Sequence, residues 1–154
     1  MALGGNMALD LSSLKKGIYA LDRSVNAAQT NTASLNEDIL EAIRAGEIRE
    51  AIRAGVIHNF EVAYDLSWKF IQRWIRENRT PEDAEHPRTR KDLFRLAARY
   101  GLIADPEPWF VYGDARNLTS HTYNEAQAVS VYETAKDFRD DAKYLLKQLK
   151  AAND

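Results

Sequence analysis

The chain has 154 residues, enough for one domain with a sizeable core, because a soluble domain of this length buries roughly 70% of the surface that its unfolded chain exposes. Its 21 Lys and Arg and 23 Asp and Glu residues give a formal charge of −2, so the charge of the whole chain gives no reason to expect a polyanionic partner. Cysteine is absent, which excludes a disulfide scaffold, a cysteine nucleophile and a thiolate metal site.

The histidines also argue against a metal site. His58, His86 and His121 stand too far apart in the chain for the His-x-x-x-His pair of a zinc-binding helix. We therefore expect any chemistry to need neither a metal ion nor another cofactor.

No segment predicts a membrane or export function. No apolar run approaches the roughly 20 residues that cross a bilayer, and the first residues lack the charged and then apolar stretches of a secretory signal. We expect a cytoplasmic protein that does not bind a membrane, with a flexible leader at residues 1–9 and a single helical domain at residues 10–154.

Amphipathic helices are predicted at both ends of the chain. In each, apolar residues recur at every third or fourth position, as they do on one face of a helix. The first set is Leu11, Leu14, Ile18, Leu21, Val25 and Ala28, and the second is Ala128, Val131, Ala135, Phe138, Ala142, Leu145 and Leu149.

A long central helix is predicted between them. Ser34 followed by Glu37 matches a capping box at its start. The apolar positions of residues 39–75 cover a broad arc, which is typical of a helix that is covered on more than one side. Gly46 and Gly55 weaken this prediction locally, since a glycine inside a helix costs about 1 kcal/mol relative to alanine.

A short duplication lies inside this central segment. The sequence Glu-Ala-Ile-Arg-Ala-Gly occurs at residues 41–46 and again at residues 50–55. Its unit is shorter than that of a solenoid, so we interpret it as a duplication within one helix.

Shorter elements are predicted in the second half of the chain. A cap at Thr80 is soon interrupted by His86-Pro87, and a helix then runs from residue 88 to residue 100 and ends at Gly101. Another helix begins at Asp105-Pro106 and extends to about residue 116.

The composition changes at residues 117–124, where a break precedes the last helix and Asn124 can serve as its cap. No segment shows the alternation of a strand. The fold class is therefore predicted to be all-α, an antiparallel bundle of four to five helices.

The candidate functional motif is Arg116-Asn117-x-x-x-His121-x-Tyr123. Arginine offers a fork of donors to phosphate oxygens, and histidine exchanges protons near neutral pH. An arginine, a histidine, an amide and a phenol together suit phosphodiester chemistry without a metal.

The spacing alone does not decide between a site and a helix junction. Arg53 and His58 have the same spacing within the predicted central helix, where five residues place the two side chains about 140° apart. Arg116 and His121 lie instead across a predicted helix end, where the backbone can bring them together. They could equally cap and solvate that junction.

The chain resembles a known family in several motifs that occur in the same order. These are residues 56–69 with Phe60-Glu61 and Trp68-Lys69, then Gly101-Leu102-Ile103, Trp109, and the Arg116 to Tyr123 motif. In this order they resemble the HEPN family of nucleotidyltransferase substrate-binding proteins, whose members include the HepT-type toxins. The likeness spans about residues 10–150, and the repeat at residues 41–55 has no place in the family pattern.

The resemblance implies a metal-independent ribonuclease toxin that acts as a homodimer and is paired with a small nucleotidyltransferase antitoxin. Carried onto this chain, it implies that Arg116 holds the scissile phosphate of RNA and that His121 is the general base or acid for attack by the 2′-hydroxyl. Asn117 would orient the pair or the substrate. Tyr123 would accept AMP from the partner, which would block the cleft by volume and by charge.

Other residues were assigned less specific roles. Glu61 is a candidate to bind the guanidinium of Arg116 and position it, without touching the substrate itself. His58 fits best as a hydrogen-bonded residue of the core or of an interface. The three tryptophans fit best as core or interface anchors, since no basic cluster adjoins them in the sequence. These are Trp68, Trp74 and Trp109.

The charge is unevenly distributed along the chain. Residues 69–104 contain nine Lys and Arg against five acidic residues, a net charge of +4, and the segments on either side each carry −3. Such a run is usually a solvated face, but it is also what an RNA-contacting surface requires. The near-neutral total therefore does not exclude RNA.

Two other functions remain open at this point. The chain could be a non-catalytic accessory subunit that presents substrate to a nucleotidyltransferase, or a purely structural bundle. The accessory subunit predicts a tight complex without ribonuclease activity, and the structural bundle predicts no effect on growth.

Overall fold

The computed structural model describes residues 9–33, 39–79 and 89–152, and all regular structure in those ranges is helical. The helices are α1 (Ser12–Ala33), α2 (Ile39–Asn78), α4 (Arg90–Arg99), α5 (Pro106–Leu118) and α6 (Glu125–Ala152), with a 3-10 turn, η2, at Thr119–His121. The predicted all-α fold is confirmed. No helix in these ranges is both long and apolar enough to cross a membrane.

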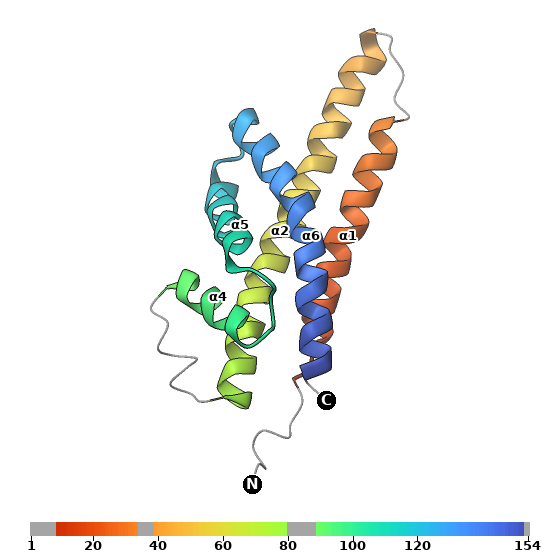
Figure 1. The fold of residues 1–154 in the computed structure, drawn as a ribbon. Coiled ribbons are helices and arrows are strands. Elements are labelled where there is room, and N and C mark those ends of the chain that lie inside the picture. Colours follow the sequence, from red (N-terminus) through yellow and green to blue (C-terminus); the bar gives the residue numbers. More distant parts are fainter. Residues whose placement is uncertain (1–8, 34–38, 80–88, 153–154) are drawn as a thin grey trace.

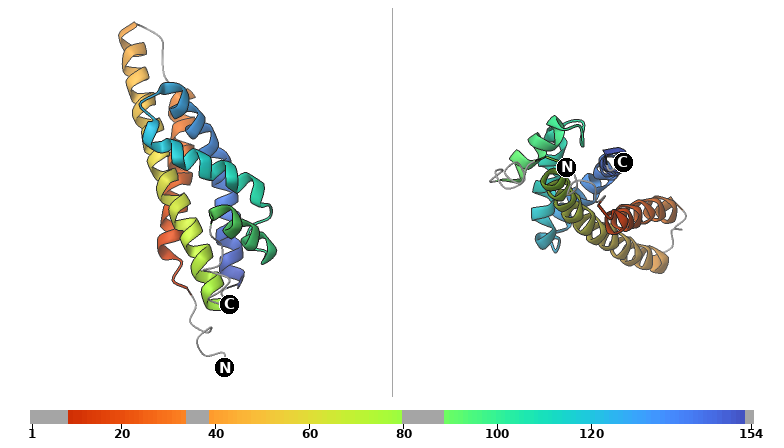
Figure 2. Two further views of the ribbon diagram at one scale, coloured as in Figure 1. Left: turned by 90° about the vertical axis from the view of Figure 1, so that its left-hand side faces the viewer. Right: turned by 90° about the horizontal axis from the view of Figure 1, so that it is seen from below.

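Three long helices form the body of the bundle. Helix α1 runs antiparallel to α2, and α6 packs against both of them (Figure 1). Helix α5 lies against α6 in the opposite direction, and the short α4 crosses beside the C-terminal half of α2 (Figures 1 and 2). The predicted antiparallel bundle is thus observed, with α2 as its central helix.

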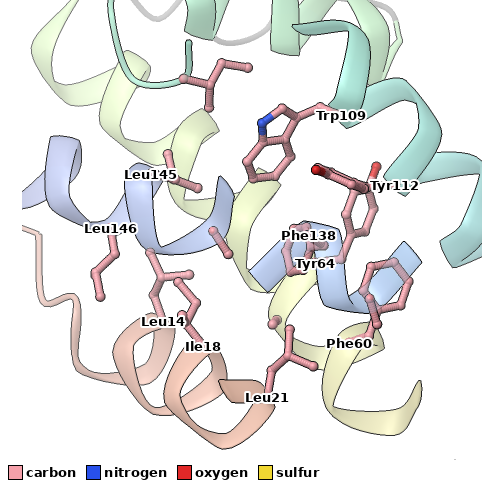
Figure 3. Packing of buried hydrophobic residues seen from close by; sticks show 14 of the residues in the cluster. Leu14, Ile18, Leu21, Phe60, Tyr64, Trp109, Tyr112, Phe138, Leu145 and Leu146 are labelled. Atoms are coloured by element: carbon pink, nitrogen blue, oxygen red, sulfur yellow. The ribbon is translucent and has the colours of Figure 1, made fainter. Parts of the chain in front are cut away.

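The core is organised around one aromatic side chain of α6. Phe138 is fully buried and makes edge-on contacts with Phe60 of α2 and with Trp109 and Tyr112 of α5, at centroid distances of 5.1 to 5.5 Å (Figure 3). Perpendicular contacts of this kind suit the charge distribution of aromatic rings. Three helices are therefore fixed relative to each other at one point, and α5 carries the candidate motif.

The predicted apolar faces of α1 and α6 are buried, but the first turns of α2 differ from the prediction. Ile43 and Ile48 keep 57% and 45% of their surface exposed. The first turns of α2 extend beyond the ends of both α1 and α6 (Figures 1 and 2). The expectation of cover on more than one side therefore holds from Val56 onward and fails in these first turns, while between them Ile52 packs against the core and Arg53 is ion-paired with Glu125 of α6.

Local capping explains where the short helices begin and end. Thr89 and Asp105 accept hydrogen bonds from backbone N–H groups in the first turns of α4 and α5. Helix α4 ends in a Schellman motif, in which Gly101 has a φ of +78° and the N–H of Leu102 bonds to the carbonyl of Ala97. The predicted cap at Asn124 is confirmed by its hydrogen bond from the N–H of Gln127.

Some predictions fall outside the described residues. These are the leader, apart from its last residue, the capping box of Ser34 and Glu37, the cap at Thr80, and the interruption at His86-Pro87.

Candidate active site

Arg116 sits on the last turn of α5, facing α2. It follows Trp109 by seven residues, two helical turns, and therefore lies on the face of α5 that packs against the bundle. Its side chain is 28% exposed. The sequence of α5 thus directs a cation toward the central helix at the point where the apolar contacts end.

The guanidinium of Arg116 is held by a carboxylate that the sequence analysis did not select. Nε and Nη2 donate to the two carboxylate oxygens of Asp65, each at 3.0 Å, which is the bidentate geometry of strong arginine pairs. Nη1 donates to Oγ1 of Thr119 at 2.8 Å. The hydroxyl of Thr119 in turn donates to the backbone carbonyl of Arg116, which closes a local ring of hydrogen bonds.

Glu61 reaches the same guanidinium, as predicted, but from farther away. Its Oε2 lies 3.5 Å from Nη1 of Arg116. Glu61 and Asp65 are four residues apart on α2, so they share one face of the helix. Each of the two acidic residues directly follows a buried aromatic residue, Phe60 or Tyr64. This repeated spacing is the signal in the sequence that could have identified Asp65.

These contacts set the electrostatics of Arg116. The hydrogen bonds to Asp65 raise the pKa of the guanidinium above its usual value, so it stays charged at every relevant pH. A guanidinium has five N–H donors, and three make hydrogen bonds here. Since Nη1 is also ion-paired with Glu61, the second N–H of Nη2 is the donor left to bind an oxyanion. The arginine is thus anchored on one side and still able to donate on the other.

His121 ends the 3-10 turn that follows α5 and is exposed to solvent. Its ring lies at a T-shaped angle to that of Tyr123, with 6.2 Å between the centroids. In the part of the chain that the structure describes, no hydrogen bond or ion pair joins its imidazole to Arg116. Arg116 therefore contacts acidic residues at the end of α5. His121 contacts Tyr123 at the far end of the 3-10 turn η2.

Asn117 and Tyr123 line two different pockets. The exposed Asn117 lines a pocket of about 250 Å³ between α2, α4 and α5. Tyr123 is 88% exposed and borders a hollow of about 290 Å³, together with Arg53 and Glu125. The phenol of Tyr123 is thus fully accessible to another macromolecule.

The second Arg/His pair is separated, as its helical spacing predicts. Arg53 points toward α6, where its Nη2 lies 3.9 Å from Oε1 of Glu125. His58 is exposed on α2, so it is not a core residue, and its alternative place in an interface stays a prediction. The two side chains form no common site.

The basic segment carries cations stacked on aromatic rings. The guanidinium of Arg90 lies 4.4 Å from the centroid of Trp68, and that of Arg79 lies 4.7 Å from Tyr100. Trp74 and Trp109 are core residues, as predicted, whereas Trp68 is only partly buried beneath Arg90. The fold therefore adds Arg90 to Lys69, the next residue in the sequence, whose Nζ lies 5.7 Å from the centroid of Trp68.

The comparisons with known proteins agree with one another. The family model for "Nucleotidyltransferase substrate binding protein like" matches residues 9–151. The probable ribonuclease HepT of Haemophilus influenzae is 33% identical over 146 residues, which cover 94% of each chain. A solved structure from the same organism, described as the fold of a substrate binding domain of a nucleotidyltransferase, matches with a TM-score of 0.79 and 32% identity, over 92% of this chain and 99% of that one.

These matches span nearly the whole chain and confirm the resemblance that the motifs carried. The Arg116 to Tyr123 motif and both acidic residues of α2 lie inside the matched range. The chain belongs to the nucleotidyltransferase substrate binding protein-like family, and within it to the HepT-like proteins.

Proposed function

We propose that the protein is a metal-independent endoribonuclease toxin whose reaction centre contains Arg116 and His121. One observation carries this proposal: a guanidinium anchored by Asp65 keeps an N–H donor on Nη2 without a hydrogen bond, one turn away from an exposed histidine. The name of the relative, a probable ribonuclease, supports the same reaction class. In the described residues, no three His, Asp or Glu side chains gather as a metal site would need.

The proposed reaction uses the 2′-hydroxyl of RNA as its nucleophile. One imidazole removes the proton of that hydroxyl, whose oxygen attacks the adjacent phosphorus, and the bond from phosphorus to the 5′-oxygen breaks. A protonated imidazole supplies a proton to the leaving 5′-oxygen, and the product carries a 2′,3′-cyclic phosphate. Arg116 neutralises the charge that develops on the phosphoryl oxygens.

We propose that the working site is formed by a homodimer. The reaction needs both a base and an acid, and each chain contributes one His121 to this motif. A two-fold axis beside the motif would place two imidazoles and two guanidiniums around one phosphate. It would also bring the separated halves of the motif together, because the Arg116 of one copy could bind the phosphate at which the His121 of the other copy acts.

Tyr123 is proposed as the control point of the enzyme. A partner nucleotidyltransferase, acting as antitoxin, would transfer AMP from ATP, so that the tyrosine oxygen binds the α-phosphorus and pyrophosphate leaves. The 88% exposure of Tyr123 supports this role, and so does its ring contact with His121. An added nucleotide would lie at the general base and repel the phosphates of RNA.

A first experiment separates this proposal from its alternatives. Purified protein is incubated with RNA in the presence of a chelator, alongside the variant His121→Ala. We expect cutting by the native chain and none by the variant, which should keep its fold because His121 is exposed. Cleavage that survives the substitution would contradict the assignment of His121.

A second experiment tests the modification. The chain is co-expressed with the proposed partner nucleotidyltransferase, and its intact mass and peptides are measured. We expect an increase by one or more AMP units on Tyr123 and none in Tyr123→Phe. AMP located on another residue would overturn this assignment.

The alternative function is a non-catalytic accessory subunit that presents substrate to a nucleotidyltransferase. The family description and the solved relative's title favour it, since both speak of substrate binding. It predicts a tight complex with the partner and no RNA cleavage by either the native chain or the variant.

A further inference from the structure

A second pocket adjoins the candidate active site and is not used by the proposed reaction. It has a volume of about 250 Å³ and lies between the C-terminal half of α2, the start of α4 and one face of α5. The rings of Tyr64, Phe94 and Trp109 lie beneath its floor and are at most 2% exposed, whereas the ring of Phe110 is partly exposed in it. Its mouth carries polar groups from Arg90, Asp114, Asn117 and two neighbours, Thr89 and Lys91.

The pocket and the Arg116 guanidinium lie on adjacent faces of the same two helices. On α2, Tyr64 lines the pocket and the next residue, Asp65, binds the guanidinium. On α5, Asn117 lines the pocket and the preceding residue is Arg116. Consecutive residues of a helix point about 100° apart, so the pocket and the guanidinium open on adjacent faces, and a strand whose phosphate lies on Arg116 could pass from one face to the other.

The planar surfaces that a ligand could reach in the pocket are the partly exposed ring of Phe110 and the guanidinium of Arg90, at a rim that also carries Lys91. Arg90 stacks on Trp68 at 4.4 Å and approaches the ring of Tyr64 at 5.7 Å, and Lys91 lies 5.4 Å from the centroid of Phe110. Aromatic rings and arginine planes are the surfaces on which proteins stack the unpaired bases of RNA. At about 250 Å³ the pocket is smaller than the roughly 300–1,000 Å³ of sites for whole small molecules, which suits a single base.

Gly113 keeps the pocket open. A Cβ at this position would come within 2.9 Å of the hydroxyl of Tyr64. Any side chain at position 113 would therefore displace the Tyr64 ring. Together these features describe a cavity with an aromatic floor, a polar entrance and an edge shared with Arg116.

We propose that this pocket binds the base of a nucleotide next to the scissile phosphate and sets the sequence preference of the enzyme. The proposal takes its ligand class from the proposed ribonuclease function. Asp114 is the residue that would read the base, because a carboxylate accepts hydrogen bonds and cannot donate them. It favours bases with an exocyclic amino group, namely adenine, cytosine and guanine, over uracil, which presents carbonyl oxygens beside its one N–H.

The test measures binding without catalysis. The probes are short oligonucleotides of 2′-O-methyl adenosine, cytidine and uridine, which lack the attacking hydroxyl. Their dissociation constants are measured for the native chain and for three variants, Asp114→Asn, Arg90→Gln and Arg95→Gln. Arg95 is the matched control, since it is an exposed cation of the same helix, stacks on Phe110 and does not line the pocket.

We expect the native chain to bind the uridine probe about tenfold more weakly than the better of the other two, the discrimination that one good set of base contacts provides. Asp114→Asn should reduce this difference to less than about threefold, because an amide can also donate. Arg90→Gln should weaken binding of all probes by about tenfold through lost stacking, and Arg95→Gln by clearly less.

The outcomes separate the pocket from the ribonuclease. Equal binding of all probes, unchanged discrimination in Asp114→Asn, or equal losses in the two arginine variants would each overturn the assignment of the pocket. Discrimination by a chain that cuts no RNA would sustain the pocket and refute the ribonuclease. Cleavage that depends on His121, in a chain that binds all three probes equally, would support the ribonuclease and refute the pocket.

Discussion

Asp65 and Glu61 approach the same guanidinium but hold it with very different geometry. Asp65 makes two hydrogen bonds of 3.0 Å to Arg116, whereas Glu61 makes one ion pair of 3.5 Å to a nitrogen that Thr119 already engages. Both carboxylates are about one-third exposed, so solvent screens each pair, and geometry distinguishes them better than charge does. We therefore interpret Asp65 as the residue that positions Arg116.

This difference predicts unequal effects on catalysis. Asp65→Asn keeps the shape of the side chain but loses the bidentate pair, and a misplaced guanidinium should lower kcat on the order of 100-fold. Glu61→Gln should lower it by less than about tenfold. Both variants should melt within a few degrees of the native chain. Equal losses in kcat, or a loss that appears in KM alone, would contradict the positioning role of Asp65.

Tyr112 provides a second prediction at the residue scale, this time for pH dependence. Its hydroxyl donates to the carboxylate of Asp141, and burial, followed by this hydrogen bond, raises the pKa of the phenol above its usual 10. A group whose pKa is higher in the folded state stabilises the fold below the pKa of the unfolded state, and this contribution is lost as the pH rises above it. The free energy of unfolding should therefore fall between about pH 9 and pH 11.

Urea unfolding at the two ends of this pH range measures the effect. Tyr112→Phe should lose less stability than the native chain across the range, because it has no proton to release at this position. The control is Tyr144→Phe, since Tyr144 is 40% exposed. A slope in Tyr112→Phe as steep as that of the native chain would assign the effect to other groups.

At the scale of single elements, α2 shows that two copies of a sequence repeat can have different burial within one helix. The two copies of Glu-Ala-Ile-Arg-Ala-Gly are offset by nine residues, and nine steps of 100° rotate equivalent positions to opposite faces. Accordingly Ala45 is buried while Ala54 is exposed, and Ile43 is exposed while Ile52 packs against the core. The duplication extends the helix without repeating its packing.

The glycines of α2 are expected to be replaceable. A Cβ at Gly46 or Gly55 would meet no atom within 4 Å, and alanine is favoured over glycine inside a helix by about 1 kcal/mol. Gly46→Ala and Gly55→Ala should therefore each raise the free energy of unfolding by up to about 1 kcal/mol in denaturant titrations. Gly101→Ala should lower it by a similar amount, because its φ of +78° disfavours a side chain. A loss of stability in both α2 variants would show that these turns need glycine.

Much of the helical architecture was predictable because its signals are local. The apolar periodicity of α1 and α6, the caps at Asp105 and Asn124 and the stop at Gly101 all depend on residues within a turn of each other. The exposure of Ile43 was not predictable, because it depends on how far α6 reaches along α2. Periodicity identifies an apolar face but does not show whether another helix covers it.

The candidate site was predictable only in part, for the same reason. Arg116, His121 and Glu61 were chosen from their chemistry and from the family motifs, and the pair between Arg116 and Glu61 is observed. Asp65 was missed because Glu61 and Asp65 lie on one face of α2, and the sequence does not show which of the two carboxylates makes the closer contact with Arg116. The pocket beside Asn117 is formed by three helices that the sequence could not orient relative to each other.

At the scale of the whole molecule, the separation of Arg116 from His121 argues for a site shared between two copies of the chain. Within one chain the guanidinium faces α2, and the imidazole points to solvent at the end of η2. The proposed homodimer would resolve this arrangement, because the Arg116 of one copy would lie near the His121 of the other. Near-neutral total charge favours such self-association, since the two copies repel each other weakly.

Mixed dimers test this arrangement. Arg116→Ala and His121→Ala should each be inactive, but co-expression of the two variants should restore a small part of the activity. A mixed dimer contains one intact arginine and one intact histidine, so one imidazole acts as the base and water must replace the missing second imidazole as the acid. Sedimentation measures whether dimers form at all. Mixed dimers that are no more active than the single variants would place the whole reaction centre within one chain.

The central claim is that the chain cuts RNA by using the 2′-hydroxyl of the substrate and His121, without a metal. The most direct measurement compares cleavage of an RNA and of its 2′-deoxy counterpart in a chelator, with analysis of the product ends. We predict that the native chain cuts only the RNA and leaves 2′,3′-cyclic phosphates, and that His121→Ala cuts neither substrate. Cutting of the 2′-deoxy strand, or equal cutting by the variant, would contradict the account.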